Sequence, residues 1–396
     1  LRVLAFTYRE IPKEHVLTAK DEAHLVFLGL IAMMDPPRVE SKDAVAECIK
    51  AGIKPIMITG DHKVTAAAIA KRIGILENMS EACEGADIEN MSDEELKEFV
   101  SNISVYARVS PEHKIRIVRA WQERGMIVAM TGDGVNDAPA LKQADIGFAM
   151  GDGTAVAQEA GDVVILNNSL TSIKDCVLNS RTMSKSVGKF LIFQLTVNIS
   201  TLLMNIIAPI LGWTEPFSIV QILWINLIMD TLAAMAFGGE PILDRYMNEK
   251  PALRKDNILT TYIKSAIGTS SVFITLGSIL ILENIGGITD FVTPAGCADP
   301  ELYEKTFMFA FFIYSIIFNS LNTRSERFNV FEHIEENKNF IIVMGVIFIL
   351  QTIIIEIGGQ VFSTTTLNAK ALFVSMLLAV LIIPVDMVRK AIVSKK

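Results

Sequence analysis

Residues 130–141 read Met-Thr-Gly-Asp-Gly-Val-Asn-Asp-Ala-Pro-Ala-Leu, and they follow the apolar run Met126–Met130. Two acids, one amide and two glycines crowd into the stretch from Gly132 to Asp137. Packing alone does not explain such a cluster behind a buried strand. Glycines let the backbone approach a ligand closely, and Asp133 and Asp137 offer the hard oxygen ligands that Mg²⁺ prefers. The stretch therefore predicts a phosphate and metal site at the end of a strand.

Short apolar runs alternate with polar helical patterns on both sides of this stretch. Strands that alternate with helices predict an α/β fold with a parallel sheet. The predicted strands are Val26–Met34, Ile53–Ile58, Ile103–Ala107, Met126–Met130, Ile146–Ala149 and Val163–Leu166. The predicted helices between them include Lys63–Ile73, Pro111–Arg124 and Thr154–Ala160.

Two further polar motifs follow predicted strands: Asp35-Pro36-Pro37-Arg38 and Thr59-Gly60-Asp61. Ligands bind beyond the carboxyl ends of parallel strands, so these loops can converge with the stretch at Asp133. Thr59 and the backbone N–H groups around Gly60 can bond phosphate oxygens, and Lys114 offers a point charge for a phosphoryl group. Alone, these motifs also fit a capped turn, a rigid turn and a solvated lysine. In this order together, they favour phosphate chemistry.

The composition changes near residue 188, after which the chain is strongly apolar. The whole sequence is 51% hydrophobic, with a mean hydropathy of +0.40. Runs of membrane-spanning length are predicted at 188–211, 217–238, 263–284, 304–321, 340–359 and 369–388. Lys and Arg concentrate in 239–262, in 322–339 and at the C-terminus, which predicts that these segments and the N-terminal half are cytosolic.

Charge and cysteine usage exclude other classes of protein. The net charge of -8 argues against nucleic-acid binding. The four cysteines have neither disulfide-framework nor zinc-site spacing.

Within the apolar half, Asn226 and Asp230 lie four residues apart and are predicted to share a helix face. A carboxylate in a membrane span indicates function, whereas Asn198 also fits an interhelical hydrogen bond.

Met57–Asp61 and residues 130–141 resemble the hinge-region signatures of P-type ATPases. The resemblance implies a haloacid-dehalogenase-like (Rossmann-type) phosphorylation domain in 1–187, incomplete here, followed in 188–396 by an all-α bundle of six helices, the family's spans five to ten. It implies that Thr59 and Gly60 hold an aspartyl phosphate, with Asp61 beside them as a further catalytic residue, and that Lys114 neutralises its charge. It implies Asp133 as the Mg²⁺ ligand supported by Asn136 and Asp137, and Asp35 and Arg38 near the nucleotide ATP.

One departure limits what this chain can do. Family members phosphorylate the Asp of an Asp-Lys-Thr-Gly-Thr motif, and the sequence has no such run. Covalent aspartyl-phosphate chemistry needs that nucleophile. We therefore expect a C-terminal part of a pump, inactive without the missing N-terminal part.

The membrane half resembles calcium pumps, especially those of the plasma-membrane type, in Gln221–Thr231 and Phe190–Asn198. The resemblance implies a bilayer-embedded, multi-pass protein of the cell membrane that exports Ca²⁺ in exchange for H⁺, with Asn226, Asp230 and more weakly Asn198 as ligands. Thr201 and Ile316 stand where two-site pumps carry glutamates, which predicts one Ca²⁺ per cycle. A pump for Na⁺, K⁺ or H⁺ and a non-catalytic regulatory module stay open as alternatives.

Overall fold

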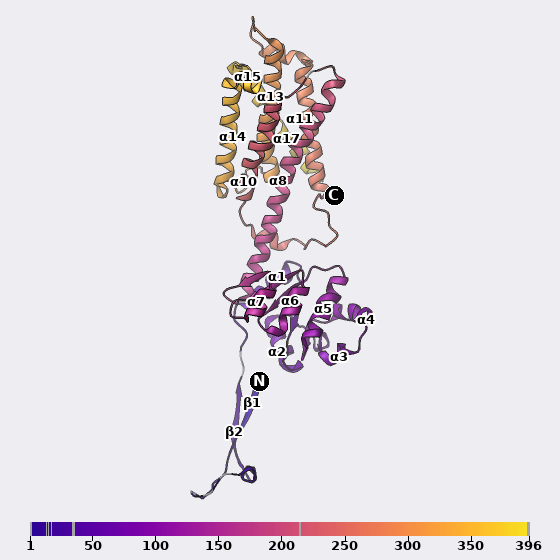
Figure 1. The fold of residues 1–396 in the computed structure, drawn as a ribbon, viewed down its shortest axis with the longest axis vertical. Coiled ribbons are helices and arrows are strands. Elements are labelled where there is room, and N and C mark those ends of the chain that lie inside the picture. The colour runs from indigo at the N-terminus through magenta and orange to yellow at the C-terminus, as the bar shows by residue number, and fades with distance from the viewer. Residues whose placement is uncertain are drawn as a thin grey trace. The chain divides into compact units, whose positions relative to one another are not determined.

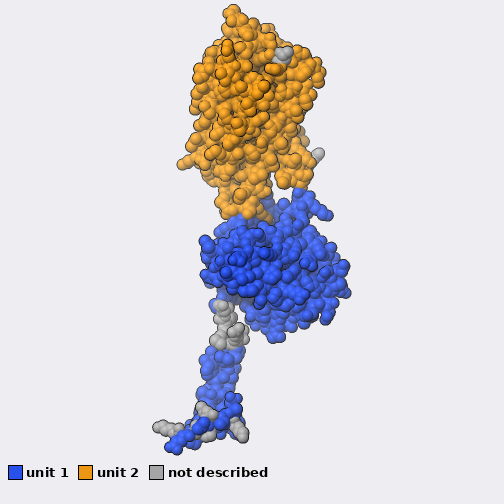
Figure 2. Space-filling model, viewed as in Figure 1, with its two compact units in different colours: residues 1–177, 245–256 blue, residues 178–244, 257–396 orange. Residues whose placement is uncertain are grey.

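A computed structural model describes residues 2–12, 14, 16, 18–33, 36–213 and 215–393. The chain forms two compact units, coloured separately in Figure 2. The first unit comprises Leu1–Val177 and Arg245–Asp256, and the second comprises Leu178–Asp244 and Asn257–Lys396. The division along the chain lies at 177/178, inside one long helix. The functional boundary expected at 187/188 stays a prediction.

The first unit contains two parallel, three-stranded sheets, as the alternating pattern predicts. One has the order β3 (Met57–Ile58), β5 (Val105–Ala107) and β4 (Ala82–Glu84). The other has the order β6 (Ala129–Gly132), β7 (Ile146–Met150) and β8 (Val163–Ile165). Both motif-bearing strands, β3 and β6, are edge strands.

Helices cover these strands, and their capping residues explain where they begin. Ser110 Oγ accepts a hydrogen bond from His113 N (3.3 Å) at the start of the helix that follows β5. Val128, just before β6, packs against the apolar clusters of both sheets. The helices are α1 (Ser41–Lys50), α2 (Lys63–Ile73), α3 (Gly85–Glu89), α4 (Asp93–Phe99), α5 (Pro111–Glu123), α6 (Ala138–Gln143) and α7 (Ala155–Ala160).

The strand predicted at Val26–Met34 differs from expectation. It forms β2 (Val26–Met33), which pairs antiparallel with β1 (Arg2–Tyr8), as Figure 1 shows. Among the described strands, β1 and β2 pair only with each other. The side chains of Phe27 and Leu28, on opposite faces of the strand, are 62% and 65% exposed. The prediction of a buried strand in the parallel sheet is therefore wrong, because the strand pairs antiparallel with β1 and both of its faces are exposed.

The second unit is an all-α bundle. Among the described residues, six helical segments are long and apolar enough to cross a membrane, which agrees with the predicted number: Leu170–Ile210, Ile219–Gly238, Thr261–Leu282, Pro300–Arg324, Lys338–Ile357 and Ala369–Val393. The helices are α8 (Leu170–Ile210), α9 (Ile219–Leu223), α10 (Asp230–Gly238), α11 (Thr261–Leu282), α12 (Ile288–Val292), α13 (Pro300–Arg324), α14 (Lys338–Ile357), α15 (Gly359–Phe362), α16 (Ala369–Val380) and α17 (Ile382–Val393).

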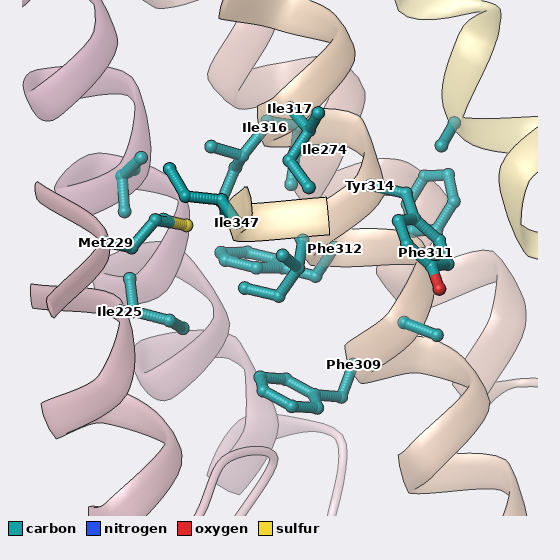
Figure 3. Packing of buried hydrophobic residues seen from close by; sticks show 14 of the residues in the cluster. Ile225, Met229, Ile274, Phe309, Phe311, Phe312, Tyr314, Ile316, Ile317 and Ile347 are labelled. Carbon is teal, nitrogen blue, oxygen red and sulfur yellow. The ribbon is translucent and has the colours of Figure 1, made fainter. Parts of the chain in front are cut away.

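Helix α13 forms the centre of this bundle. Most of its side chains are buried, including Phe307, Phe309 and Phe312. Figure 3 shows Phe309, Phe312 and Ile316 of α13 between residues of the neighbouring helical segments, such as Met229 and Ile347. Such a continuous apolar core fixes how the six helical segments pack, because side chains in a core interdigitate at high density.

Candidate functional site

The loop after β3 lies against the N-terminal end of α5. Arg108 N donates to Asp61 O (3.1 Å) and Val109 N donates to Thr59 O (3.4 Å). Asp61 N also donates to Thr59 Oγ1 (3.1 Å), which closes a tight turn. Thr59 is half-buried, whereas Gly60 and Asp61 are exposed. The turn therefore presents Gly60 and Asp61 at the end of the strand, beside the helix that carries Lys114.

Lys114 connects this region to the loop after β6. Its Nζ lies 2.5 Å from Asp137 Oδ1. The other carboxylate oxygen of Asp137 accepts hydrogen bonds from Asp133 N (3.2 Å) and Gly134 N (3.1 Å). Burial acts to raise the pKa of Asp137, but the bonds from Lys114 and Gly134 outweigh it, and the pKa lies below its ordinary value. Asp137 thus organises the loop as an anion.

The glycine at 132 is required by this arrangement. A Cβ atom at that position would lie 2.4 Å from the Asp137 Cβ, closer than atoms can approach. Any larger residue would push Asp137 away from Lys114. The glycine is therefore part of the site although it carries no functional group.

Asp133 and Asn136 both have exposed side chains. The backbone of Asp133 is held, because its carbonyl oxygen accepts a hydrogen bond from Thr154 N (2.8 Å) at the start of α7. Asp137 is occupied by Lys114, so Asp133 is the carboxylate of this loop that fits a hard cation. No group of three or more His, Cys, Asp or Glu that could hold a metal ion occurs in the described part of the chain. A Mg²⁺ ion here would need further ligands.

The remaining predicted cofactor residues lie elsewhere. Asp35 is outside the described residues. Arg38 is exposed and donates through Nη1 to Asn167 O (3.2 Å), in the loop that follows β8. The structure thus bonds Lys114 of α5 directly to Asp137 in the loop after β6, and it bonds Thr59 and Asp61 to the backbone of Arg108 and Val109, just before α5. It does not connect Arg38 to them.

Asp230 is the buried carboxylate of the second unit. It opens α10 directly after a π-helical turn, η5 (Trp224–Met229). The side chain is 6% exposed, and its Oδ1 has no hydrogen-bond partner among the described residues. Gln194 of α8 is its hydrogen-bonding neighbour. A π turn often marks a functional site, and a buried anionic oxygen without a partner is costly unless a cation binds it.

The other predicted ion ligands, Asn226 and Asn198, and the two positions predicted to lack an acid, Thr201 and Ile316, differ in their burial. Asn226, within the π turn, is exposed, so the structure does not bring it onto one buried face with Asp230. Asn198 on α8 is half-buried. Thr201 has a buried Oγ1 without a partner in the described part of the chain. Ile316 is buried in α13 and brings no oxygen.

Sequence reasoning missed two buried ionic clusters of the bundle. Asp386 is 1% exposed, and its carboxylate lies 2.6 Å from Arg389 Nε and 3.1 Å from Lys390 Nζ. The side chain of Glu240 is 5% exposed and bonds to Lys189 and Arg324. The i, i+3 and i+4 spacing of Asp386, Arg389 and Lys390 could have revealed the first cluster. The second joins residues far apart in sequence, so no local pattern reveals it.

Comparison with known protein families covers both units. Residues 214–392 match the model described as "Cation transporting ATPase, C-terminus". Residues 2–145 match a model of haloacid dehalogenase-like hydrolases, and residues 115–176 match a second model with the same description.

Individual relatives agree with these matches. A "Calcium-transporting ATPase 1" of Bacillus cereus is 39% identical over 90% of this chain and 41% of its own length. A "Calcium-transporting ATPase 5, plasma membrane-type" of Oryza sativa subsp. japonica is 37% identical over 99% of this chain and 37% of its own length. A "Calcium-transporting ATPase 9, plasma membrane-type" of Arabidopsis thaliana is 35% identical over 97% of this chain and 36% of its own length. The chain therefore spans about two fifths of these relatives.

Proposed function

The chain belongs to the P-type calcium-transporting ATPase family, and we propose that it forms the C-terminal part of a pump that exports Ca²⁺ from the cytosol at the expense of ATP. The observation that carries this proposal is Asp230, a carboxylate that is 6% exposed and keeps an oxygen without a partner in the described bundle. A buried carboxylate of this kind is most simply accounted for by a cation that completes it. The α/β unit is proposed to carry the residues for the phosphate chemistry that drives transport.

The phosphate residues have distinct proposed roles. Thr59 and Gly60 hold the phosphoryl group, with Asp61 bracing the turn, and Lys114 neutralises developing charge. Mg²⁺, held by Asp133 with Asn136 in support, would screen the phosphoryl oxygens when bound. The Lys114–Asp137 ion pair (2.5 Å) supports this assignment, because it holds Lys114 at the loop that carries Asp133 before any ligand arrives.

The binding of ATP and the phosphorylated aspartate are proposed to lie in a further, N-terminal part of the pump. The chain alone is therefore proposed to be inactive. Asp35 and Arg38 are proposed to lie near the nucleotide in the complete pump.

One Ca²⁺ per cycle is the proposed stoichiometry, with H⁺ as the counter-ion. Asp230 is the proposed charged ligand, Asn226 in the preceding π turn is the proposed second ligand once the complete site forms, and Asn198 is the weaker candidate. Thr201 and Ile316 bring no carboxylate to a second site, and Ca²⁺ affinity depends on the number of charged ligands. The protein is proposed to lie in the cell membrane, with its N-terminal half and its C-terminus in the cytosol.

Occlusion of ⁴⁵Ca per phosphoenzyme in the full-length protein tests the proposal. We expect a ratio near one, and a ratio near two would mean that Thr201 and its neighbours build a second site. Stimulation of phosphoenzyme by Na⁺ or K⁺ instead of Ca²⁺ would favour a different cation. A full-length protein that forms no phosphoenzyme would favour the non-catalytic module.

A further inference from the structure

Four polar residues from four separate segments meet inside the bundle, and we name them the Glu240 cluster: Lys189, Glu240, Arg324 and Asn337. Glu240 follows the end of α10, and its carboxylate bonds to Lys189 Nζ of α8 and to Arg324 Nε of α13 (3.0 Å). Asn337 Nδ2, at the start of α14, donates to the same carboxylate (2.9 Å). Glu240 therefore joins all four segments.

The Glu240 cluster is deeply buried. The exposed fractions of the side chains are 8% for Lys189, 5% for Glu240 and 2% for Arg324. Removing such charges from water costs free energy, and an apolar cluster of the same size often stabilises a fold equally well. Stability alone therefore does not explain why an ionic cluster occupies this place. Fixed register between helices is the role for which buried polar groups are best attested.

Apolar packing already holds the same helices together beside the cluster. The rings of Phe193 (α8) and Phe237 (α10) lie 5.6 Å apart, and those of Phe237 and Phe340 (α14) lie 5.8 Å apart. The Arg324 guanidinium lies 5.6 Å from the centre of the Phe340 ring. Aromatic contacts of this kind tolerate sliding, whereas hydrogen-bonded charges do not. The ionic bonds add direction to a contact that is already stable.

The cluster also connects α8, which carries the proposed ligand Asn198, to the end of the helix that begins with the proposed ligand Asp230. Helix α8 runs without interruption from Leu170 to Ile210 and carries Lys189. Helix α10 begins with Asp230, and Glu240 lies just beyond its end. Through Lys189 and Glu240, a displacement of α8 along its axis reaches the helix that bears the buried carboxylate.

One donor of the cluster is unused in this conformation. Arg324 Nη1 is buried and has no partner among the described residues. Arg324 therefore keeps unused hydrogen-bonding capacity beside its bond to Glu240.

We propose that Glu240 is a positioning residue that couples α8 to the Asp230-bearing helix through Lys189, with Arg324 and Asn337 as its anchors. This inference rests on the proposed function, because the helices are coupled for ion transport. Lys189→Met in the full-length pump should lower the Ca²⁺ transported per ATP hydrolysed by about tenfold, in the range typical of allosteric coupling. Glu240→Gln should act in the same direction, and Lys189→Arg should restore the ratio.

The matched control is Lys185→Met. Lys185 lies one turn earlier on α8 and pairs with Glu326 (3.2 Å), where both side chains are partly exposed. This variant loses the same charge from the same helix and should keep the ratio of the unmodified pump. Lys189→Met leaves Glu240 bonded to Arg324 and Asn337, so it tests the inference even if Glu240→Gln fails to fold.

The ratio of Ca²⁺ transported to ATP hydrolysed separates coupling from stability. A cluster that only stabilises the fold would lower the yield and the melting temperature of Lys189→Met but leave this ratio unchanged, which would overturn the inference. An unmodified full-length protein without Ca²⁺-dependent phosphoenzyme would instead overturn the proposed function, and the inference with it.

Discussion

The two acidic centres of this molecule are built in opposite ways. In the α/β unit, Asp137 is bonded to Lys114 and to two backbone N–H groups. The side chain of Asp133 in the same loop is exposed. In the helical unit, the acid itself is buried, and Asp230 keeps an oxygen without a partner in the described bundle. The first centre is organised before a ligand arrives. The second is incomplete without one, which teaches that exposure alone does not identify an ion-binding carboxylate.

The largest effect is expected from removing the charge of Asp133, the exposed acid of the first centre. Asp133→Asn in the full-length pump should abolish Mg²⁺-dependent phosphorylation, because it removes the charged ligand while keeping the side-chain shape. Formation of acid-stable phosphoenzyme from ATP is the measurement. Asp43→Asn, an exposed change in the first turn of α1, is the control and should leave phosphorylation intact. Normal phosphoenzyme in Asp133→Asn would move the Mg²⁺ ligand elsewhere.

Next in size is a change that separates the two centres. Asp230→Asn should eliminate Ca²⁺ transport but leave phosphorylation by inorganic phosphate possible, because the phosphate residues lie in the other unit. Uptake of ⁴⁵Ca into vesicles and phosphorylation by ³²P-labelled phosphate measure the two activities. Loss of both activities would show that the centres are not separable in this way.

A smaller effect tests whether Asp137 is structural. Asp137→Asn should destabilise the loop by about 2–4 kcal/mol, because it leaves Lys114 without a charged partner. Hydrogen exchange of the backbone amides of Gly134 and its neighbours measures this local opening. Exchange as slow as in the unmodified chain would mean that Lys114 finds another partner.

Acid should reproduce part of that change without a mutation. The pKa of Asp137 is lowered in the folded chain, so its contribution to stability is present above its unfolded pKa of about 3.9 and is lost as the pH falls through the folded value. The difference in amide exchange between the unmodified chain and Asp137→Asn should therefore shrink below about pH 4. If the difference in amide exchange persisted at lower pH, it would have a cause other than the charge of Asp137.

The smallest expected effect concerns the core beside the first centre. Burial raises the pKa of the Cys83 thiol to about 12, with the Asp87 charge adding to it. Cys83 on β4 should resist alkylation at pH 8 while the sheet is folded, whereas the half-buried Cys176 should react faster. Mass spectrometry of the labelled peptides measures both. Rapid labelling of Cys83 would indicate that the β3-β5-β4 sheet opens readily in this chain.

Local patterns predicted much of this molecule. The stretch at Asp133 and the alternating runs predicted a parallel α/β fold, and run lengths predicted the six spanning helical segments. The α-helical spacing assumed for Asn226 and Asp230 did not foresee the π turn, because such a turn depends on packing around it. The burial assigned to Val26–Met34 was wrong, because a strand's neighbours are not encoded in its own sequence. Lys189 and Glu240 meet only once four segments have packed.

The two edge strands have a consequence for how the α/β unit is handled in a cell. Among the described strands, β3 and β6 each pair on one side only, so the other edge of each is open to pairing with a further strand. An open strand edge favours self-association through intermolecular strand pairing. An extended peptide supplied in trans could pair with the same edges. The unit is therefore a natural starting point for a split-protein complementation assay, in which recovery of solubility reports insertion of the added strand.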